Sequence, residues 1–166
     1  MVIHMADHVL IAYFTHSGST RQIAEQIHEQ VGGDLLAIQP EIPYPVSYDA
    51  VVEQAKKEIR AGYRPALKSD IGKLDSYDAI LVGSPNWWST IAPPVATFLS
   101  QSDLTGKTVV PFCTHGGGGL GRVATDIAKL CPESTVLESF AIRGDAGGNA
   151  QSKLTAWLQK IGVAVK

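Results

Sequence analysis

The sequence has few of the features that mark nucleic-acid-binding and membrane proteins. Only 18% of its 166 residues are charged, and 14 basic against 16 acidic residues give a formal net charge of −2 at pH 7. No basic run is present, although contact with a phosphate backbone needs a concentrated Lys/Arg surface. No apolar run approaches the ~20 residues of a membrane-spanning helix. We therefore expect neither a nucleic-acid partner nor membrane insertion.

Cysteine and histidine are too sparse or too scattered to build a metal site. The two cysteines, Cys113 and Cys131, lack CxxC or zinc-ligand spacing, so we expect structural thiols in a reduced compartment. The histidines show no ligand spacing either, and no metal is assigned. They are His4, His8, His16, His28 and His115.

The segment at residues 1–7 is too short and too poor in basic residues for a secretory signal. We expect it to be a disordered terminus or a cloning remnant, with the domain spanning residues 8–166. A cytoplasmic location is the corresponding expectation.

What the sequence does contain is a strict alternation of strand-like and helix-like segments. Apolar, β-rich runs are predicted as strands at residues 8–14, 35–39, 79–83, 107–114 and 136–142. Amphipathic runs between and after them are predicted as helices at residues 19–31, 48–61, from about 93, 120–130 and 150–161. This order predicts one α/β domain, with a parallel five-stranded sheet covered by helices on both faces. Ligands of such sheets bind at the carboxyl ends of the strands, so the loops after the first, third and fourth strands should carry the function.

The first of these loops is rich in hydroxyl groups and opens a helix. Helix N-terminal N–H groups and the helix dipole favour an anion, and serine or threonine hydroxyls can donate to phosphate oxygens. The lysine of a nucleotide-triphosphate loop and the GxGxxG pattern are both missing. Simple helix capping is the alternative, but one such residue would suffice for it. The residues assigned to a phosphate are Thr15, His16, Ser17, Gly18, Ser19 and Thr20.

The second loop contains two adjacent tryptophans after Pro85 and Asn86. Trp87 and Trp88 cannot both point to one face of a helix or strand, so at least one should be exposed or cover a ligand. Indole rings stack well on flat heteroaromatic rings, and Asn86 can meet ring nitrogens or carbonyls. The alternative is that the tryptophans are hydrophobic cover for the following helix.

The third loop is glycine-rich and directly follows a predicted core strand. Repeated glycines are unfavourable for folding, and here they suit a backbone lying flat against a planar ligand. A flexible linker is the alternative. His115 is a candidate catalytic residue, although an isolated histidine can equally be structural. The residues assigned to ligand contact are Thr114, His115, Gly116, Gly117 and Gly118.

Residues 13–21, 83–88 and 111–117 together resemble the flavodoxin family, specifically flavodoxin-like flavoproteins with an Asn-Trp-Trp loop and a Thr-His-Gly-Gly-Gly loop. Tyr44 and Tyr48 also match, and the likeness covers residues 8–162. The resemblance implies a three-layer α/β/α flavodoxin-like fold with sheet order 2-1-3-4-5 and non-covalently bound flavin mononucleotide (FMN). It implies that residues 15–20 hold the phosphate and that residues 85–88 and those from 114 onward contact the ring.

Two departures from shuttle flavodoxins direct the functional hypothesis. The chain lacks their strong acidity, and its glycine-rich loop has no tyrosine to stack on the ring. An open ring face would accept a quinone or a nicotinamide. The first hypothesis is therefore an FMN-dependent oxidoreductase that passes electrons from NAD(P)H or a protein donor to a small acceptor such as a quinone, with His115 in a catalytic role.

The alternative is a flavodoxin-type single-electron carrier between redox proteins, and a flavin-sensing module is a third hypothesis. The proline-rich segment at residues 40–45 and the aromatic loops offer a surface for a homodimer, which the sequence leaves open.

Overall fold

The computed structural model describes residues 8–68, 72–144, 149–163 and 165, so the predicted N-terminal segment at residues 1–7 lies outside the described residues. The strands are β1 (Val9–Tyr13), β2 (Asp34–Ala37), β3 (Ala79–Pro85), β4 (Thr108–His115), β5 (Thr135–Val136) and β6 (Phe140–Arg143). The helices are α1 (Ser19–Val31), α2 (Tyr48–Ala61), α3 (Pro93–Gln101), α4 (Val123–Leu130) and α5 (Asn149–Lys160). All strand pairs are parallel, in the order β2-β1-β3-β4-β5, with β6 also pairing with β4. The predicted fold class and strand order are confirmed.

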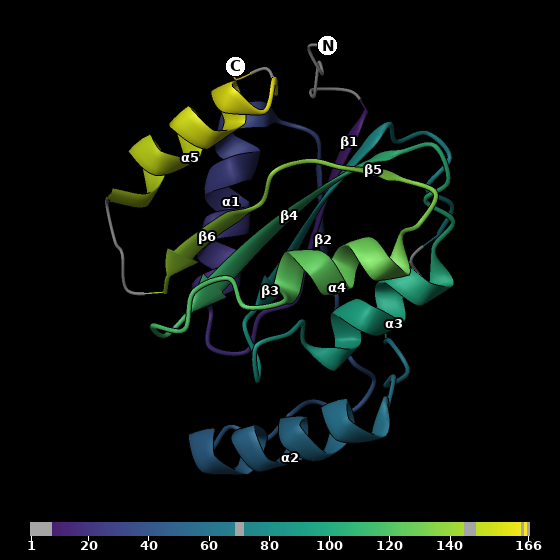
Figure 1. The fold of residues 1–166 in the computed structure, drawn as a ribbon, viewed down its shortest axis with the longest axis vertical. Coiled ribbons are helices and arrows are strands. Elements are labelled where there is room, and N and C mark those ends of the chain that lie inside the picture. Colours follow the sequence, from purple (N-terminus) through teal and green to yellow (C-terminus); the bar gives the residue numbers. More distant parts are fainter. Residues whose placement is uncertain (1–7, 69–71, 145–148, 164, 166) are drawn as a thin grey trace.

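Two apolar layers hold the helices to the sheet. Residues of α1 and α5 pack on one face, and residues of α3 and α4 pack on the other, as Figure 1 shows. Alternate strand residues supply the two layers: Ile11 belongs to the first and Ala12 to the second. Each fully buried Leu, Ile or Phe contributes roughly 1.5–3 kcal/mol relative to an exposed one, which explains why the central strands are apolar on both faces.

Helix α2 is the least buried of the cover helices. Its buried residues are Val51 and Ala55, and in Figure 1 it lies furthest from the sheet. Ser47 precedes the helix, and Gly62, in the left-handed region at φ 64°, ends it. None of the helices in the described part of the chain is both long and apolar enough to cross a membrane.

The fifth strand is interrupted where the sequence predicted one run from 136 to 142. Val136 of β5 pairs with Val109 of β4, and Phe140 of β6 pairs with Phe112 of β4. The two pairs are three residues apart along β4 but four residues apart along the edge strand. The extra residue makes a bulge that separates β5 from β6. Within it, the Glu138 carbonyl accepts the indole N–H of Trp157 on α5 at 2.9 Å. The prediction of one continuous strand at residues 136–142 was therefore wrong. At Glu138 the carbonyl bonds to the Trp157 indole instead of to the neighbouring strand.

The two cysteines lie in the core layer beneath α3 and α4 and are free thiols. Burial raises the pKa of Cys113 from 9.0 to about 12, and burial raises the pKa of Cys131 from 9.0 to about 11. Each thiol has a higher pKa in the folded protein than in the unfolded chain, so the unfolded chain ionises first as the pH rises. The contribution of the neutral, buried thiol to stability is therefore complete below the pKa of the unfolded chain. That contribution is lost as the pH rises through the folded pKa.

We expect the free energy of unfolding to fall between pH 9 and 11, by up to about 1.4 kcal/mol per pH unit for each thiol. Urea denaturation at pH 7, 9 and 10.5 measures this fall. The double variant Cys113→Ala with Cys131→Ala is the control and should show a shallower decline. Equal declines in the wild type and the double variant would contradict the assignment to the thiols.

Candidate functional site

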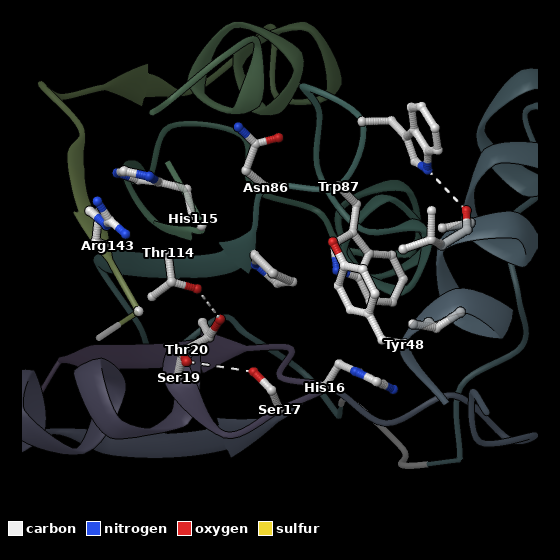
Figure 2. Close-up of a pocket in the computed structure, with 17 residues that line it drawn as sticks. His16, Ser17, Ser19, Thr20, Tyr48, Asn86, Trp87, Thr114, His115 and Arg143 are labelled. Carbon is white, nitrogen blue, oxygen red and sulfur yellow. Dashed lines mark hydrogen bonds between the residues drawn. The ribbon is translucent and has the colours of Figure 1, made fainter. Parts of the chain in front are cut away.

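A cleft of about 750 Å³ lies at the carboxyl ends of β1, β3, β4 and β6, where the first, second and third loops converge. The inner side of α2 forms its outer wall, as Figure 2 shows. This volume is in the upper part of the usual range for cofactor pockets, about 300–1,000 Å³. The three loops that the sequence singled out therefore meet in one cavity.

The first loop presents an uncapped helix N-terminus to the cleft. Gly18 is the N-cap of α1, in the left-handed region at φ 103°, and within the described residues no side chain caps it. Its own N–H donates to Thr15 Oγ1 at 3.0 Å, which shapes the turn. No side chain of the described residues therefore occupies the first-turn N–H groups of α1, and the capping alternative does not describe this loop. Of the predicted phosphate residues, the cleft is lined by His16, Ser17, Ser19 and Thr20.

A buried pair of hydroxyl groups fixes the first loop to the third. Thr20 Oγ1 lies 2.7 Å from Thr114 Oγ1, and both residues are buried. Ser17 Oγ and Ser19 Oγ are 3.5 Å apart at the edge of the cleft. The contact between the two threonines sets the position of α1 relative to β4, whereas the serine hydroxyls face the cavity (Figure 2).

The second loop is a two-residue hairpin. The N–H of Trp87 donates to the Thr90 carbonyl at 2.9 Å, and the N–H of Thr90 donates to the Trp87 carbonyl at 3.1 Å. Trp88 and Ser89 between them are both left-handed, at φ 54° and 68°, as the type I′ turn requires. This backbone directs the two indole rings to different surroundings.

Trp87 belongs to an aromatic cluster, whereas Trp88 reaches α2. The Trp87 ring is edge-on to Phe14 and Tyr44, with centroids 5.4 and 5.0 Å away. Trp88 is 47% exposed, and its indole N–H donates to the Val52 carbonyl at 3.0 Å. Trp88 therefore ties the hairpin to the outer wall of the cleft, and both rings line the cavity.

Asn86 is held by the third loop. Its backbone N–H donates to the Thr114 carbonyl at 2.8 Å, and its side-chain Nδ2 donates to the Gly119 carbonyl, also at 2.8 Å. With its amide N–H₂ engaged in this way, the side chain braces the glycine-rich loop against the end of β3. Pro85 and Asn86 both line the cleft.

The glycine-rich loop curls around His115. The Gly117 N–H donates to His115 Nδ1 at 3.0 Å, so a neutral imidazole carries its hydrogen on Nε2. His115 thus presents a donor N–H, and it lines the cleft with Thr114 and Gly116. The remaining predicted residues lie beside the cleft rather than in its lining. They are Thr15, Gly18, Gly117 and Gly118.

The sequence model of the family described as Flavodoxin matches residues 8–161. The chain belongs to the flavodoxin family. The predicted resemblance is thereby confirmed over nearly the whole described chain.

Solved structures agree with this flavodoxin-family assignment. A protein of Bacteroides eggerthii designated a flavoprotein is 32% identical, with 95% of this chain and 99% of that chain covered and a TM-score of 0.82. A second such protein, from Bacteroides uniformis, is 27% identical, with 93% and 99% covered and a TM-score of 0.80. A flavoprotein of Lactobacillus acidophilus in complex with FMN is 24% identical, with 89% and 99% covered and a TM-score of 0.68, and shows the shared fold. Among the curated proteins, none matches this chain.

This flavodoxin-family cleft also has walls that the loop motifs did not reveal. Helix α2 contributes Tyr48, Val51, Val52 and Ala55, and the end of β6 contributes Arg143 with the adjoining Gly144. The apolar residues of α2 have the same spacing whether they face a core or a cavity, so their pattern does not distinguish the two. Arg143 becomes visible only through its pairing with β4.

The described residues that line the cleft include no aspartate or glutamate. Nor do the described residues hold a group of three or more His, Cys, Asp or Glu side chains placed to bind a metal. The cavity instead combines hydroxyls and helix N–H groups at one end with aromatic and aliphatic surface along α2. This combination fits a ligand that has an anionic group and a flat apolar ring.

Proposed function

We propose that this chain is an FMN-dependent oxidoreductase that passes electrons from a reduced nicotinamide or a protein donor to a small acceptor such as a quinone. The observation that carries the proposal is the uncapped N-terminus of α1, which opens into the aromatic-walled cleft beside Ser17 and Ser19. Family membership, together with the FMN complex of the Lactobacillus acidophilus relative, bears out the cofactor prediction.

Different residues of the cleft would bind the phosphate and the ring of FMN. Ser17, Ser19 and the first-turn N–H groups of α1 would hold the phosphate. The hairpin at residues 85–88 and the loop at 114–118 would hold the ring, with Trp87 fixed by its aromatic neighbours. When bound, FMN supplies the electron and hydride transfer, and the protein orients it.

His115 is the residue we assign to the chemistry of the substrate. Its Nδ1 is occupied by the Gly117 N–H, so its Nε2–H is the group that can donate to a developing oxyanion on the acceptor. Its place at the end of β4, in the lining of the cleft, puts that donor beside the ring-binding loops.

The test is an absorption spectrum of the purified protein followed by anaerobic stopped-flow mixing. We expect the bands of oxidised flavin, their bleaching by NADH or NADPH, and their rapid return on adding a naphthoquinone. A His115→Ala variant should retain the bands and slow the return by roughly 10²–10³-fold, the range for removing one oxyanion donor. If neither nicotinamide bleaches the flavin, and the quinone also fails to reoxidise flavin that has been reduced with dithionite, the oxidoreductase function is wrong and the electron carrier is the remaining hypothesis.

A further inference from the structure

Glu58 of α2 is hydrogen-bonded to a buried tyrosine outside its own helix. Tyr44 lies in the connection between β2 and α2, and its hydroxyl donates to Glu58 Oε1 at 2.6 Å. The other carboxylate oxygen, Oε2, accepts from the side-chain Nε2 of Gln54 at 2.8 Å. Both oxygens therefore accept from neutral donors, and the carboxylate is held in one orientation toward Tyr44.

The bond between Tyr44 and Glu58 is strong for a contact at the edge of a helix. Burial and the hydrogen bond to Glu58 raise the pKa of Tyr44 above its ordinary value, so the phenol keeps its proton and remains a donor. A hydrogen bond to a carboxylate is roughly twice as strong as one between neutral groups. Since the buried residues of α2 are Val51 and Ala55, such polar contacts add to what attaches the helix to the domain.

The ring of Tyr44 extends this contact to Trp87 in the wall of the cleft. Tyr44 and Trp87 meet edge to face, with centroids 5.0 Å apart and ring planes at 85°. Phe14 and His16 also lie edge-on to Trp87, with centroids 5.4 and 6.0 Å away. Trp87 itself lines the cleft, where Figure 2 labels it. A continuous set of contacts therefore leads from the Glu58 carboxylate to a ring of the candidate FMN site.

A second hydrogen bond fixes the backbone beside Tyr44. His16 Nε2 donates to the Pro45 carbonyl at 2.8 Å, which ties the main chain here to the first loop. The hydroxyl is at the far end of the Tyr44 side chain, so its bond to Glu58 restrains rotation about the Cα–Cβ bond. With the backbone and the hydroxyl both held, the Tyr44 ring stays against Trp87.

We propose that Glu58 is a positioning residue for the FMN ring: through the Tyr44 hydroxyl it holds Trp87 in the orientation in which the indole meets the flavin. The proposal rests on one part of the proposed function, the placement of the ring at residues 85–88. Glu58 is not among the residues that line the cleft, so it acts on the flavin through the two aromatic rings. Helix α2 would thus both wall the cleft and fix the ring site from behind.

The fluorescence lifetime of bound FMN tests this role without turnover. An indole in contact with a flavin ring quenches its emission and shortens its lifetime, and time-resolved emission separates bound from free FMN. We expect Glu58→Leu to lengthen the lifetime of bound FMN and to weaken FMN binding by about tenfold. Glu58→Gln keeps an oxygen that can accept from Tyr44 and should restore most of the quenching. Glu53→Leu, the matched control at an exposed glutamate of the same helix, should change neither quantity.

Tyr44→Phe tests the same contact from its other end. The substitution removes the hydroxyl and keeps the ring, so it decides the proposal even if Glu58→Leu destabilises α2. We expect a lengthened lifetime, and the double variant with Glu58→Leu should show no more than the larger single effect, because both changes remove one interaction. In a Trp87→Phe background, Glu58→Leu should lengthen the lifetime no further.

The outcomes separate the positioning role from the proposals beneath it. Unchanged lifetimes in Glu58→Leu and Tyr44→Phe, with a longer one in Trp87→Phe, would overturn the positioning role alone. Weaker FMN binding with a wild-type lifetime, or additive effects in the double variant, would overturn it as well. An unchanged lifetime in Trp87→Phe would overturn both this role and the placement of the ring. Failure of NADH and NADPH to reduce the flavin would count against the oxidoreductase function, and the lifetimes would still decide the role of Glu58.

Discussion

Replacing Gly83 with alanine is expected to remove about 3 kcal/mol or more of folding stability, a large part of the 5–15 kcal/mol typical of a domain. Gly83 lies in β3 and is paired in register with Phe112 of β4. A Cβ atom on Gly83 would lie 2.3 Å from both Cε2 and Cζ of the Phe112 ring, closer than real Cβ contacts allow. The ring is fully buried at the centre of the sheet, so it cannot move aside without displacing the layer beneath α1 and α5.

Urea denaturation of the wild type and the Gly83→Ala variant at pH 7 measures this loss of folding stability. Gly116→Ala is the matched control, because no atom lies within 4 Å of the Cβ it would add. Adding Phe112→Leu to Gly83→Ala should recover part of the lost stability, as a coupling energy between the two positions. A Gly83→Ala protein as stable as the wild type would mean that the Phe112 ring does not occupy this position.

The fold was predictable largely because its central strands are apolar on both faces. The run at residues 8–14 and the run at 79–83 could be read as buried parallel strands with little ambiguity, and the structure places them side by side as β1 and β3. The strand order came from the family resemblance rather than from periodicity. The edge strand was less predictable, because its bulge depends on the indole of Trp157 reaching the Glu138 carbonyl from a distant helix. The sequence pattern of the edge strand alone does not reveal a contact with a residue of a distant helix.

The loops of the site were predictable for a related physical reason. Parallel strands end at the same edge, so loops that follow different strands must converge there. The separate roles of the two tryptophans could not be predicted. A type I′ hairpin is usually recognised in a sequence by Asn or Gly at its two central positions. Here Trp88 and Ser89 occupy these positions and adopt the left-handed conformation. Arg143 was missed because its place beside His115 exists only through strand pairing.

A Ser17→Asp substitution is expected to weaken FMN binding by roughly a hundredfold or more while leaving the apo-protein slightly more stable. Ser17 is exposed, lines the cleft and precedes the N-cap of α1. Like charges near a protein surface repel by about 4 kcal/mol at 4 Å, and tenfold in affinity corresponds to about 1.4 kcal/mol. The same carboxylate would complement the helix dipole and stabilise the apo-protein by about 0.3–1 kcal/mol.

The opposite signs of these two effects make the experiment selective. FMN affinity is measured by the quenching of flavin fluorescence on binding, and apo-protein stability by thermal unfolding after the flavin is removed. Ser17→Asn is the control, since it has the shape of the aspartate without its charge, and it should weaken FMN far less. An aspartate variant that binds FMN as tightly as the asparagine variant would mean that the phosphate lies elsewhere. A variant that loses both FMN and apo-protein stability would point instead to damage to the loop itself. Only a loss of binding with stability retained or raised fits an anion held at the N-terminus of α1.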